Sequence, residues 1–325
     1  MKILVPSGLE LTIERGTDTI RIDYDPLLPI PGEHQDAEFL VAWGNTQNQL
    51  EDTARRLTSL RWVQSLAAGS EGVLAAGFSD SVVITSGRSL HDGPVAEHAL
   101  ALALAGVRSL HTLGRRQAMH VWSSDLGGAQ VESSDGPLIT LHDARVLVWG
   151  FGSIAATLAP WLSDLGAIVT GVARSAGIRG RFPVISEQHI DEVLPTTDLL
   201  ILILPGDAAN RHVLSTSRLA LLPSRAWVVN VGRGIAIDEA ALVEALEDGR
   251  LAGAALDVFE SEPLAESSPL WDLPNVIISP HSAGGRPRGA EELVNRNLAA
   301  LLAHAPLTNV VSARGRVDAL KGTHG

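Results

Sequence analysis

The chain has 325 residues, 45% of them hydrophobic and 19% charged, which indicates a folded globular protein too long for one ordinary core. Its formal net charge of −12 argues against non-specific nucleic-acid binding, and no apolar run reaches the roughly 20 residues of a membrane span. Because cysteine is absent, disulfides, zinc–thiolate sites and thiol nucleophiles are excluded, which fits the cytoplasm.

The first third of the chain alternates short apolar runs with helix-like polar stretches. The first run reads as a strand and lacks the features of a signal peptide; the runs cover residues 3–6, 36–43, 60–66 and 82–85. Strands that alternate with helices predict a parallel sheet, so we expect a small α/β unit here. A helix rich in Ala and Leu follows at residues 95–108, and its largely apolar surface must be buried.

Residues 145–155 carry the strongest motif, an apolar strand that runs into a G-x-G-x-x-A fingerprint. Gly150 can make the tight turn out of the strand, Gly152 lets a pyrophosphate approach the backbone, and Ala155 lets the next helix pack closely. The free N–H groups and positive dipole end at the start of that helix would hold the pyrophosphate. A helix to about residue 165 and a strand at 167–172 complete a nucleotide-binding pattern.

After this motif the alternation resumes, with further strands expected at residues 198–204, 226–231, 254–258 and 276–279. Asp238 is expected to cap a helix that ends near Asp248. Pro287 suits the first turn of a last helix that reaches about Ala303. We expect a loop at residues 123–136 and a loose tail at 312–325.

Polar side chains follow three of these strands: Arg233 in Asn-Val-Gly-Arg-Gly, Glu262 in Asp-Val-Phe-Glu-Ser-Glu-Pro and His281 in Ser-Pro-His-Ser-Ala-Gly. Carboxyl ends of parallel strands meet where open α/β sheets bind ligands. Arg233 can fork onto a carboxylate and a carbonyl oxygen, His281 can protonate that oxygen, and Glu262 can hold the imidazolium. These groups suit the reduction of a 2-oxo acid, and no His–carboxylate spacing indicates a metal.

Together with the fingerprint, these motifs resemble the D-isomer-specific 2-hydroxyacid dehydrogenases, a family that includes phosphoglycerate, glyoxylate/hydroxypyruvate and D-lactate dehydrogenases. The resemblance extends to residues 64–69, 94–98 and 309–311 and so covers nearly the whole chain. It implies an α/β protein of two Rossmann-like or flavodoxin-like lobes, each with a parallel sheet, and a cleft between them. The implied substrate-binding domain is discontinuous, residues 1–93 with 285–325, and the implied NAD(P)-binding Rossmann domain is 94–284.

The resemblance also implies residue roles, with Arg233, Glu262 and His281 catalytic. The turn Ala68, Gly69 and Ser70, together with Arg233, would bind the substrate carboxylate. Asp257 would lie near the nicotinamide carboxamide, and Glu97 and His98 would have a structural role at the domain junction. The expected cofactor-binding residues are Gly150, Phe151, Gly152, Ser153, Ile154, Arg174, Ser175, Leu204, Pro205, Val231, Gly232, Asp257 and His281. A homodimer through the cofactor domain is implied as well.

The chain departs from the family pattern near the end of the second fingerprint strand. NAD-specific sites place an acid about 20 residues past the glycines, and this chain has Arg174 and Ser175 there. These residues suit a 2′-phosphate, with Arg179 or Arg181 as helpers, so NADP(H) is favoured over NAD(H). If Arg174 instead stacks on adenine, NAD or dual use remains open.

Two further departures concern loops. After Leu204-Pro205 the family often has threonines, whereas this chain has Gly206, Asp207 and Asn210. Arg286 and Arg288 either receive a second anionic group of the substrate or are solvated charges.

The expected function is NAD(P)H-dependent reduction of a short 2-oxo acid, such as glyoxylate or hydroxypyruvate, to the D-2-hydroxy acid. Hydride would come from nicotinamide C4 and the proton from His281. The alternatives are a D-3-phosphoglycerate dehydrogenase-like activity and a non-catalytic, nucleotide-sensing co-repressor-like protein. The expected partner is a small anionic 2-oxo or 2-hydroxy acid, with no nucleic acid, membrane or metal. We expect no serine feedback, because the chain ends before the regulatory domain of some phosphoglycerate dehydrogenases.

Overall fold

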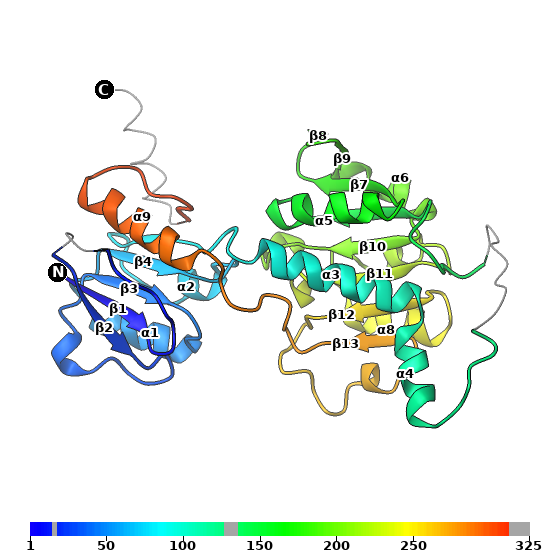
Figure 1. Ribbon diagram of the computed structural model, residues 1–325, viewed down its shortest axis with the longest axis horizontal. Helices are drawn as coiled ribbons and strands as arrows, with labels where there is room; N and C mark the ends of the chain where they lie inside the picture. The colour runs from blue at the N-terminus through cyan, green and yellow to red at the C-terminus, as the bar shows by residue number, and fades with distance from the viewer. Residues whose placement is uncertain (15–17, 127–135, 312–325) are drawn as a thin grey trace. The chain divides into compact units, whose positions relative to one another are not determined.

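Two sheets, one in each of two units, organise the residues that the computed structural model describes, 1–14, 18–126 and 136–311 (Figure 1). Unit 1 comprises Met1–His91 and Arg286–Gly325, and unit 2 comprises Asp92–Gly285. The boundaries expected from the sequence fell at residues 94 and 284, within two residues of this division. The expected tail and most of the expected loop at 123–136 lie outside the described residues.

Unit 1 contains a five-stranded parallel sheet in the order β2-β1-β3-β4-β5, which is the flavodoxin-like arrangement. Its strands are β1 (Lys2–Pro6), β2 (Ile20–Tyr24), β3 (Phe39–Ala42), β4 (Trp62–Ser65) and β5 (Val83–Thr85). Its helices are α1 (Gln47–Arg56), α2 (Glu71–Ala75) and α9 (Ala290–Leu302). The sequence did not predict β2, an edge strand in which only Tyr24 is fully buried.

Alternate residues of the unit 1 strands face two separate cores, as the twofold period of a strand requires. Leu4 and Leu40 pack with Leu50 of α1, whereas Ile3 and Phe39 pack with Leu298 of α9. The C-terminal helix therefore completes a sheet that begins at the N-terminus, and neither segment closes this core without the other.

The expectation that Pro287 lies in the first turn of the last helix is wrong, because α9 begins at Ala290. Gly289 precedes it in the left-handed region, with φ +78°. The backbone N–H of Arg288 donates to the Leu90 carbonyl at 2.9 Å, which ties residue 288 to a loop before the helical turns begin.

Unit 2 contains an eight-stranded sheet in the order β13-β12-β11-β10-β6-β7-β9-β8, with β8 alone antiparallel to its neighbour. With β6 numbered as strand 1 and β8 omitted, the order read from β9 to β13 is 3-2-1-4-5-6 with one further strand. The strand order reverses direction between β6 and β10. The strands are β6 (Arg145–Trp149), β7 (Ile168–Ala173), β8 (Gly177–Arg179), β9 (Phe182–Ser186), β10 (Leu199–Leu202), β11 (Trp227–Asn230), β12 (Gly253–Leu256) and β13 (Val276–Ile278).

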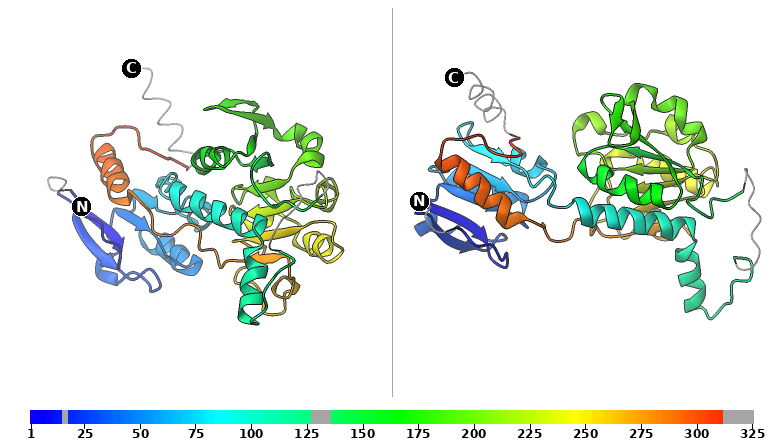
Figure 2. Two further views of the ribbon diagram at one scale, coloured as in Figure 1. Left: turned by 45° about the vertical axis from the view of Figure 1, so that its right-hand side comes forward. Right: turned by 45° about the horizontal axis from the view of Figure 1, so that its top comes forward.

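Helices cover both faces of this second sheet. α3 and α5 pack side by side on one face, and α6, α7 and α8 pack on the other (Figure 2). The helices are α3 (Asp92–Val107), α4 (Leu110–Ala118), α5 (Ser153–Asp164), α6 (Ile190–Val193), α7 (Thr216–Leu219) and α8 (Glu239–Glu247). As expected, Asp238 caps α8 by accepting from the Ala241 N–H at 3.1 Å. No described helix is both long and apolar enough to cross a bilayer.

The two fingerprint glycines have different reasons to lack a side chain. Gly150 has φ +98°, and a Cβ placed on it would lie 2.3 Å from the carbonyl oxygen of Ile203. A Cβ on Gly152 would meet nothing within 4 Å. The fold therefore requires glycine at position 150, whereas position 152 borders open space at the start of α5.

We predict that Gly150→Ala lowers the free energy of unfolding by about 2–4 kcal/mol, because it combines left-handed backbone strain with a clash against Ile203. Gly152→Ala is the matched control and should change stability by less than about 0.5 kcal/mol. Denaturant unfolding followed by circular dichroism measures both, and equal stabilities for the two variants would contradict the assignment.

Candidate active site

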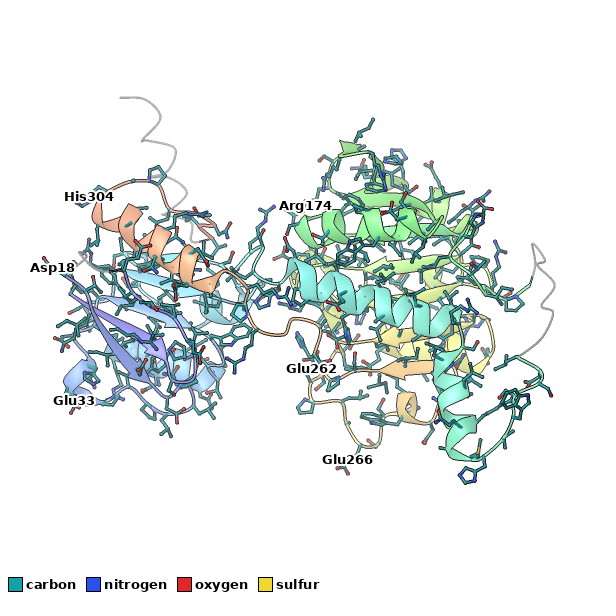
Figure 3. The ribbon with its side chains drawn as sticks, in the orientation of Figure 1. Asp18, Glu33, Arg174, Glu262, Glu266 and His304 are labelled. Atoms are coloured by element: carbon teal, nitrogen blue, oxygen red, sulfur yellow. The ribbon has the colours of Figure 1, made fainter. Side chains whose placement is uncertain are left out.

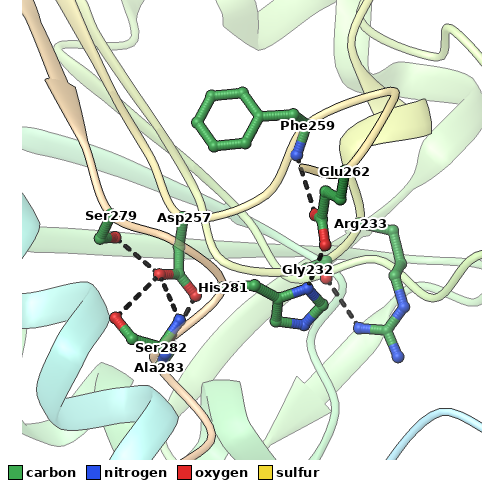
Figure 4. Close-up of polar contacts among 9 residues, drawn as sticks. All are labelled: Gly232, Arg233, Asp257, Phe259, Glu262, Ser279, His281, Ser282 and Ala283. Atoms are coloured by element: carbon green, nitrogen blue, oxygen red, sulfur yellow. Dashed lines mark hydrogen bonds and ion pairs between the residues drawn. The ribbon is translucent and has the colours of Figure 1, made fainter. Parts of the chain in front are cut away.

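Three adjacent parallel strands present the expected catalytic residues at one edge of the unit 2 sheet (Figure 4). Asn230 of β11 pairs with Leu256 of β12, and Leu256 pairs with Ile278 of β13. The residues that follow these strands therefore leave the sheet at the same edge, which is where α/β folds bind ligands.

His281 and Glu262 are in direct contact, with 2.7 Å between imidazole Nδ1 and carboxylate Oε2. The other carboxylate oxygen accepts the Phe259 N–H at 3.1 Å, which fixes its orientation. Because a carboxylate only accepts, Nδ1 carries a hydrogen and Nε2 is the ring atom suited to proton transfer. The His281 side chain is 48% exposed, so a small molecule can reach it.

Arg233 lies on a turn that Asn230 shapes and that touches the turn leading to Glu262. The Asn230 side chain accepts from Gly232 N at 3.1 Å and donates to the Arg233 carbonyl at 3.0 Å. A Cβ on Gly234 would lie 1.9 Å from the carbonyl carbon of Phe259, so the two turns are in backbone contact. The guanidinium Nη1 donates to the Gly232 carbonyl at 2.9 Å, as Figure 4 shows.

Asp257 is 1% exposed and holds the loop on which His281 lies. Its Oδ1 accepts from Ser279 Oγ at 2.6 Å and Ser282 N at 2.9 Å, and its Oδ2 accepts from Ala283 N at 3.0 Å. His281 itself is left-handed, with φ +50°, and its N–H donates to the Asp257 carbonyl at 2.8 Å. Bonds on both sides of His281 thus stabilise a backbone conformation that non-glycine residues seldom adopt.

The adenosine end of a dinucleotide would meet a second group of expected residues at the same edge. Arg174 and Ser175 follow β7 directly and are exposed, and Figure 3 shows Arg174 and Glu262 along one side of unit 2. Arg179 of β8 donates to the carbonyl of Phe151 in the fingerprint turn. Arg181 instead pairs with Asp164 at 3.1 Å and precedes β9, which places it at the opposite edge.

The turns that follow β6, β10 and β11 pack closely and form a continuous backbone surface. A Cβ on Gly232 would lie 2.5 Å from the backbone nitrogen of Leu204. Pro205 follows Leu204, and buried Val231 precedes Gly232. Ser153 begins α5, with Ile154 next to it, and the first N–H groups of a helix have no acceptor within it.

Residues 100–283 match the family model described as D-isomer specific 2-hydroxyacid dehydrogenase, NAD binding domain. The chain belongs to this family. It is thus an oxidoreductase that uses a nicotinamide cofactor, and its α/β architecture of two mostly parallel sheets confirms the expected fold class.

Relatives of this family member include glyoxylate/hydroxypyruvate reductase A of Salmonella newport, which is 34% identical over 191 residues. That alignment covers 57% of the chain and 58% of the relative, so it spans little more than half of either protein. A Xanthobacter autotrophicus D-isomer specific 2-hydroxyacid dehydrogenase, solved with NADPH and MES, is 26% identical with TM-score 0.76, covering 97% of this chain and 99% of that one. An NADPH-dependent glyoxylate/hydroxypyruvate reductase of Sinorhizobium meliloti, solved with NADP and sulfate, is 25% identical with TM-score 0.77, covering 95% and 97%.

The expected substrate turn, Ala68, Gly69 and Ser70, lies in unit 1, separated from the end of β4 by two residues. Its neighbour Ala67 accepts from Gly87 N at 2.8 Å, and Ser70 precedes α2. The turn thus occupies the carboxyl edge of the unit 1 sheet, and its joint action with Arg233 stays a prediction. Arg286 is exposed, with Nη1 3.4 Å from the Gly8 carbonyl, and Arg288 is exposed as well.

Sequence reasoning expected only a structural role for His98 at the domain junction and missed its contact with the site. His98 Nε2 lies 2.9 Å from Ser279 Oγ and 3.3 Å from Asp257 Oδ1, so α3 contacts the loop that carries His281. The expected role of Asp257 at the carboxamide stays a prediction, whereas the bonds it makes here are to that loop. Among the described residues no group of three His, Asp or Glu side chains could hold a metal ion.

Proposed function

We propose that the chain reduces a short 2-oxo acid of the glyoxylate or hydroxypyruvate kind to the D-2-hydroxy acid with NADPH. The 2.7 Å pair of His281 and Glu262, at the sheet edge that also carries Arg233, is the observation on which this rests. The names of the Salmonella and Sinorhizobium relatives, both glyoxylate/hydroxypyruvate reductases, support the substrate class.

The residues present fit a dinucleotide. Gly152 leaves room for a pyrophosphate at the start of α5, whose N–H groups and positive dipole end would hold it. The bound dihydronicotinamide supplies the hydride. Arg233 would bind the substrate carboxylate and the carbonyl oxygen, which makes C2 more electrophilic. As C2 is reduced, protonated His281 Nε2 would give its proton to the carbonyl oxygen, and Glu262 would orient the ring.

A preference for NADPH is part of the proposal. Arg174 and Ser175 stand where NAD-specific sites place an acid, and Arg179 contacts the fingerprint turn nearby. Both solved relatives described above contain NADPH or NADP.

A homodimer through unit 2 is also proposed. Apolar side chains are exposed on α4 and just after it, and Trp122 is 91% exposed; the others are Leu110, Leu113, Met119 and Val121. Such a patch on one segment is typical of a surface that another protein covers.

Light scattering should give the mass of two chains, and a monomer at micromolar concentration would contradict the proposed homodimer.

Two alternatives predict different substrates. A phosphoglycerate dehydrogenase-like enzyme would prefer phosphohydroxypyruvate, for which the exposed Arg286 and Arg288 could supply positive charge. A nucleotide-sensing protein would bind the cofactor without turnover. A panel of glyoxylate, hydroxypyruvate, pyruvate and phosphohydroxypyruvate with NADPH and NADH separates the three, and no turnover on any acid favours the sensor.

We predict that His281→Ala lowers kcat by roughly 10²–10⁴-fold on the best acid of this panel, because it removes the proton donor. His189→Ala is the control, since it deletes another exposed histidine that lies 2.9 Å from a glutamate, Glu192, in the same unit. Steady-state oxidation of NADPH measures both variants. Turnover by His281→Ala close to that of His189→Ala would falsify the proposed role.

We predict that Arg174→Ala weakens NADPH binding by roughly 10- to 100-fold and NADH binding much less, because hydrogen bonds to a charged group contribute about 1.5–3 kcal/mol. Arg181→Ala serves as the control, because its guanidinium pairs with Asp164 at the other edge of the sheet. Binding titrations with both cofactors decide the matter. Equal losses of affinity for NADPH and NADH in Arg174→Ala would contradict a 2′-phosphate site and favour NAD(H).

A further inference from the structure

The acid missing after β7 has a counterpart on another turn of the same sheet edge, the one after β10, which is separated from β7 by β6. Asp207, in the turn after β10, places its carboxylate Oδ2 3.3 Å from Arg174 Nη2. A carboxylate therefore lies where the adenosine ribose is expected, although it comes from a different strand than in the usual NAD site. The Arg174 side chain is 80% exposed and the Asp207 side chain is 53% exposed, so a ligand can reach both.

Hydrogen bonds order the backbone of the turn that carries Asp207. Asn210 is 8% exposed; its side-chain amide donates to the Pro205 carbonyl at 2.9 Å, and its backbone N–H donates to the Asp207 carbonyl at 2.8 Å. The following residue, Arg211, donates to the Ala208 carbonyl at 3.1 Å. These bonds fix the backbone of the turn that carries Asp207.

We propose that Asp207 is a specificity-determining residue that opposes Arg174 in the choice between NADP(H) and NAD(H). Its carboxylate disfavours a 2′-phosphate and accepts a hydrogen bond from a 2′-hydroxyl, whereas Arg174 favours the phosphate. The inference rests on the proposed function, because it assumes that the 2′ position of the cofactor lies at Arg174.

The electrostatics differ between the two cofactors. If Arg174 binds a 2′-phosphate, the Asp207 carboxylate beside the same guanidinium repels the phosphate charge, which in an exposed site costs roughly 3- to 10-fold in affinity. With NAD(H) the Arg174–Asp207 pair persists and the carboxylate can still accept from the ribose. Asp207 thus weakens the preference for NADP(H) over NAD(H) that Arg174 creates.

Asp207→Asn tests this by removing the charge while keeping the shape. Asp164→Asn is the matched control, because Asp164 is also exposed, also pairs with an arginine, at 3.1 Å, and lies at the end of α5 away from the ligand edge. Isothermal titration with NADPH and NADH, without substrate, gives the ratio of dissociation constants for each variant. Unfolding midpoints check that the variants fold alike.

We expect the ratio of the NADPH to the NADH dissociation constant to fall roughly 3- to 10-fold in Asp207→Asn and to stay unchanged in Asp164→Asn. Asp207→Glu, which keeps the charge, should hold the ratio near wild type, and the effect should shrink as salt is added. A ratio that is unchanged in Asp207→Asn, or that moves toward NADH, overturns the inference.

The outcome is separable from that of the proposed function. If Arg174→Ala loses NADPH selectively while Asp207→Asn leaves the ratio unchanged, the cofactor proposal stands and the inference about Asp207 fails. If the protein turns over no 2-oxo acid, the function fails, and the binding ratios still decide the role of Asp207.

Discussion

A buried carboxylate determines where His281 lies. Asp257 follows β12 directly, and its two oxygens accept from residues on both sides of His281. Burying a charge is costly unless hydrogen bonds and a nearby positive or polar group compensate. The loop amides, Ser279 and the neighbouring His98 supply that compensation, so the left-handed conformation of His281 and the burial of Asp257 depend on each other.

The parallel register of β11, β12 and β13 places the other two side chains of the site near His281. Paired strands end at one edge, and the short turns after them bring Arg233, Glu262 and His281 to that edge from three separate motifs. The contact between Gly234 and Phe259 leaves no room for a side chain, so the first two turns cannot shift independently. The spacing of these three side chains is therefore a property of the sheet more than of any one loop.

Much of the fold could be predicted because buried parallel strands have a clear signature of branched apolar residues. Three strands were missed: β8 is exposed throughout and β2 buries only Tyr24, whereas β9 buries Phe182 and Val184 but is interrupted by Pro183. The expected start of α9 was wrong because a proline suits a first turn in general, whereas Gly289 and the Arg288–Leu90 bond decide this one. Such tertiary contacts leave no periodic trace in a sequence.

For the site, residue types and motif order were enough to single out Arg233, Glu262 and His281, since each follows a strand. The contacts of His98 with Ser279 and of Arg174 with Asp207 join residues from different elements, so spacing along the chain could not indicate them. What the sequence showed at Arg174 was the lack of an acid. The carboxylate that the turn after β10 contributes there became visible only in three dimensions.

The two fingerprint glycines separate the needs of folding from the needs of ligand binding. One is crowded by a carbonyl oxygen, and the other faces empty space. A descendant of this chain that had ceased to hold dinucleotides would be free to acquire alanine or serine at position 152, yet would still have to keep glycine at 150. Among all descendants of this chain, the residue at position 152 would therefore distinguish those that still bind a nucleotide from those that do not.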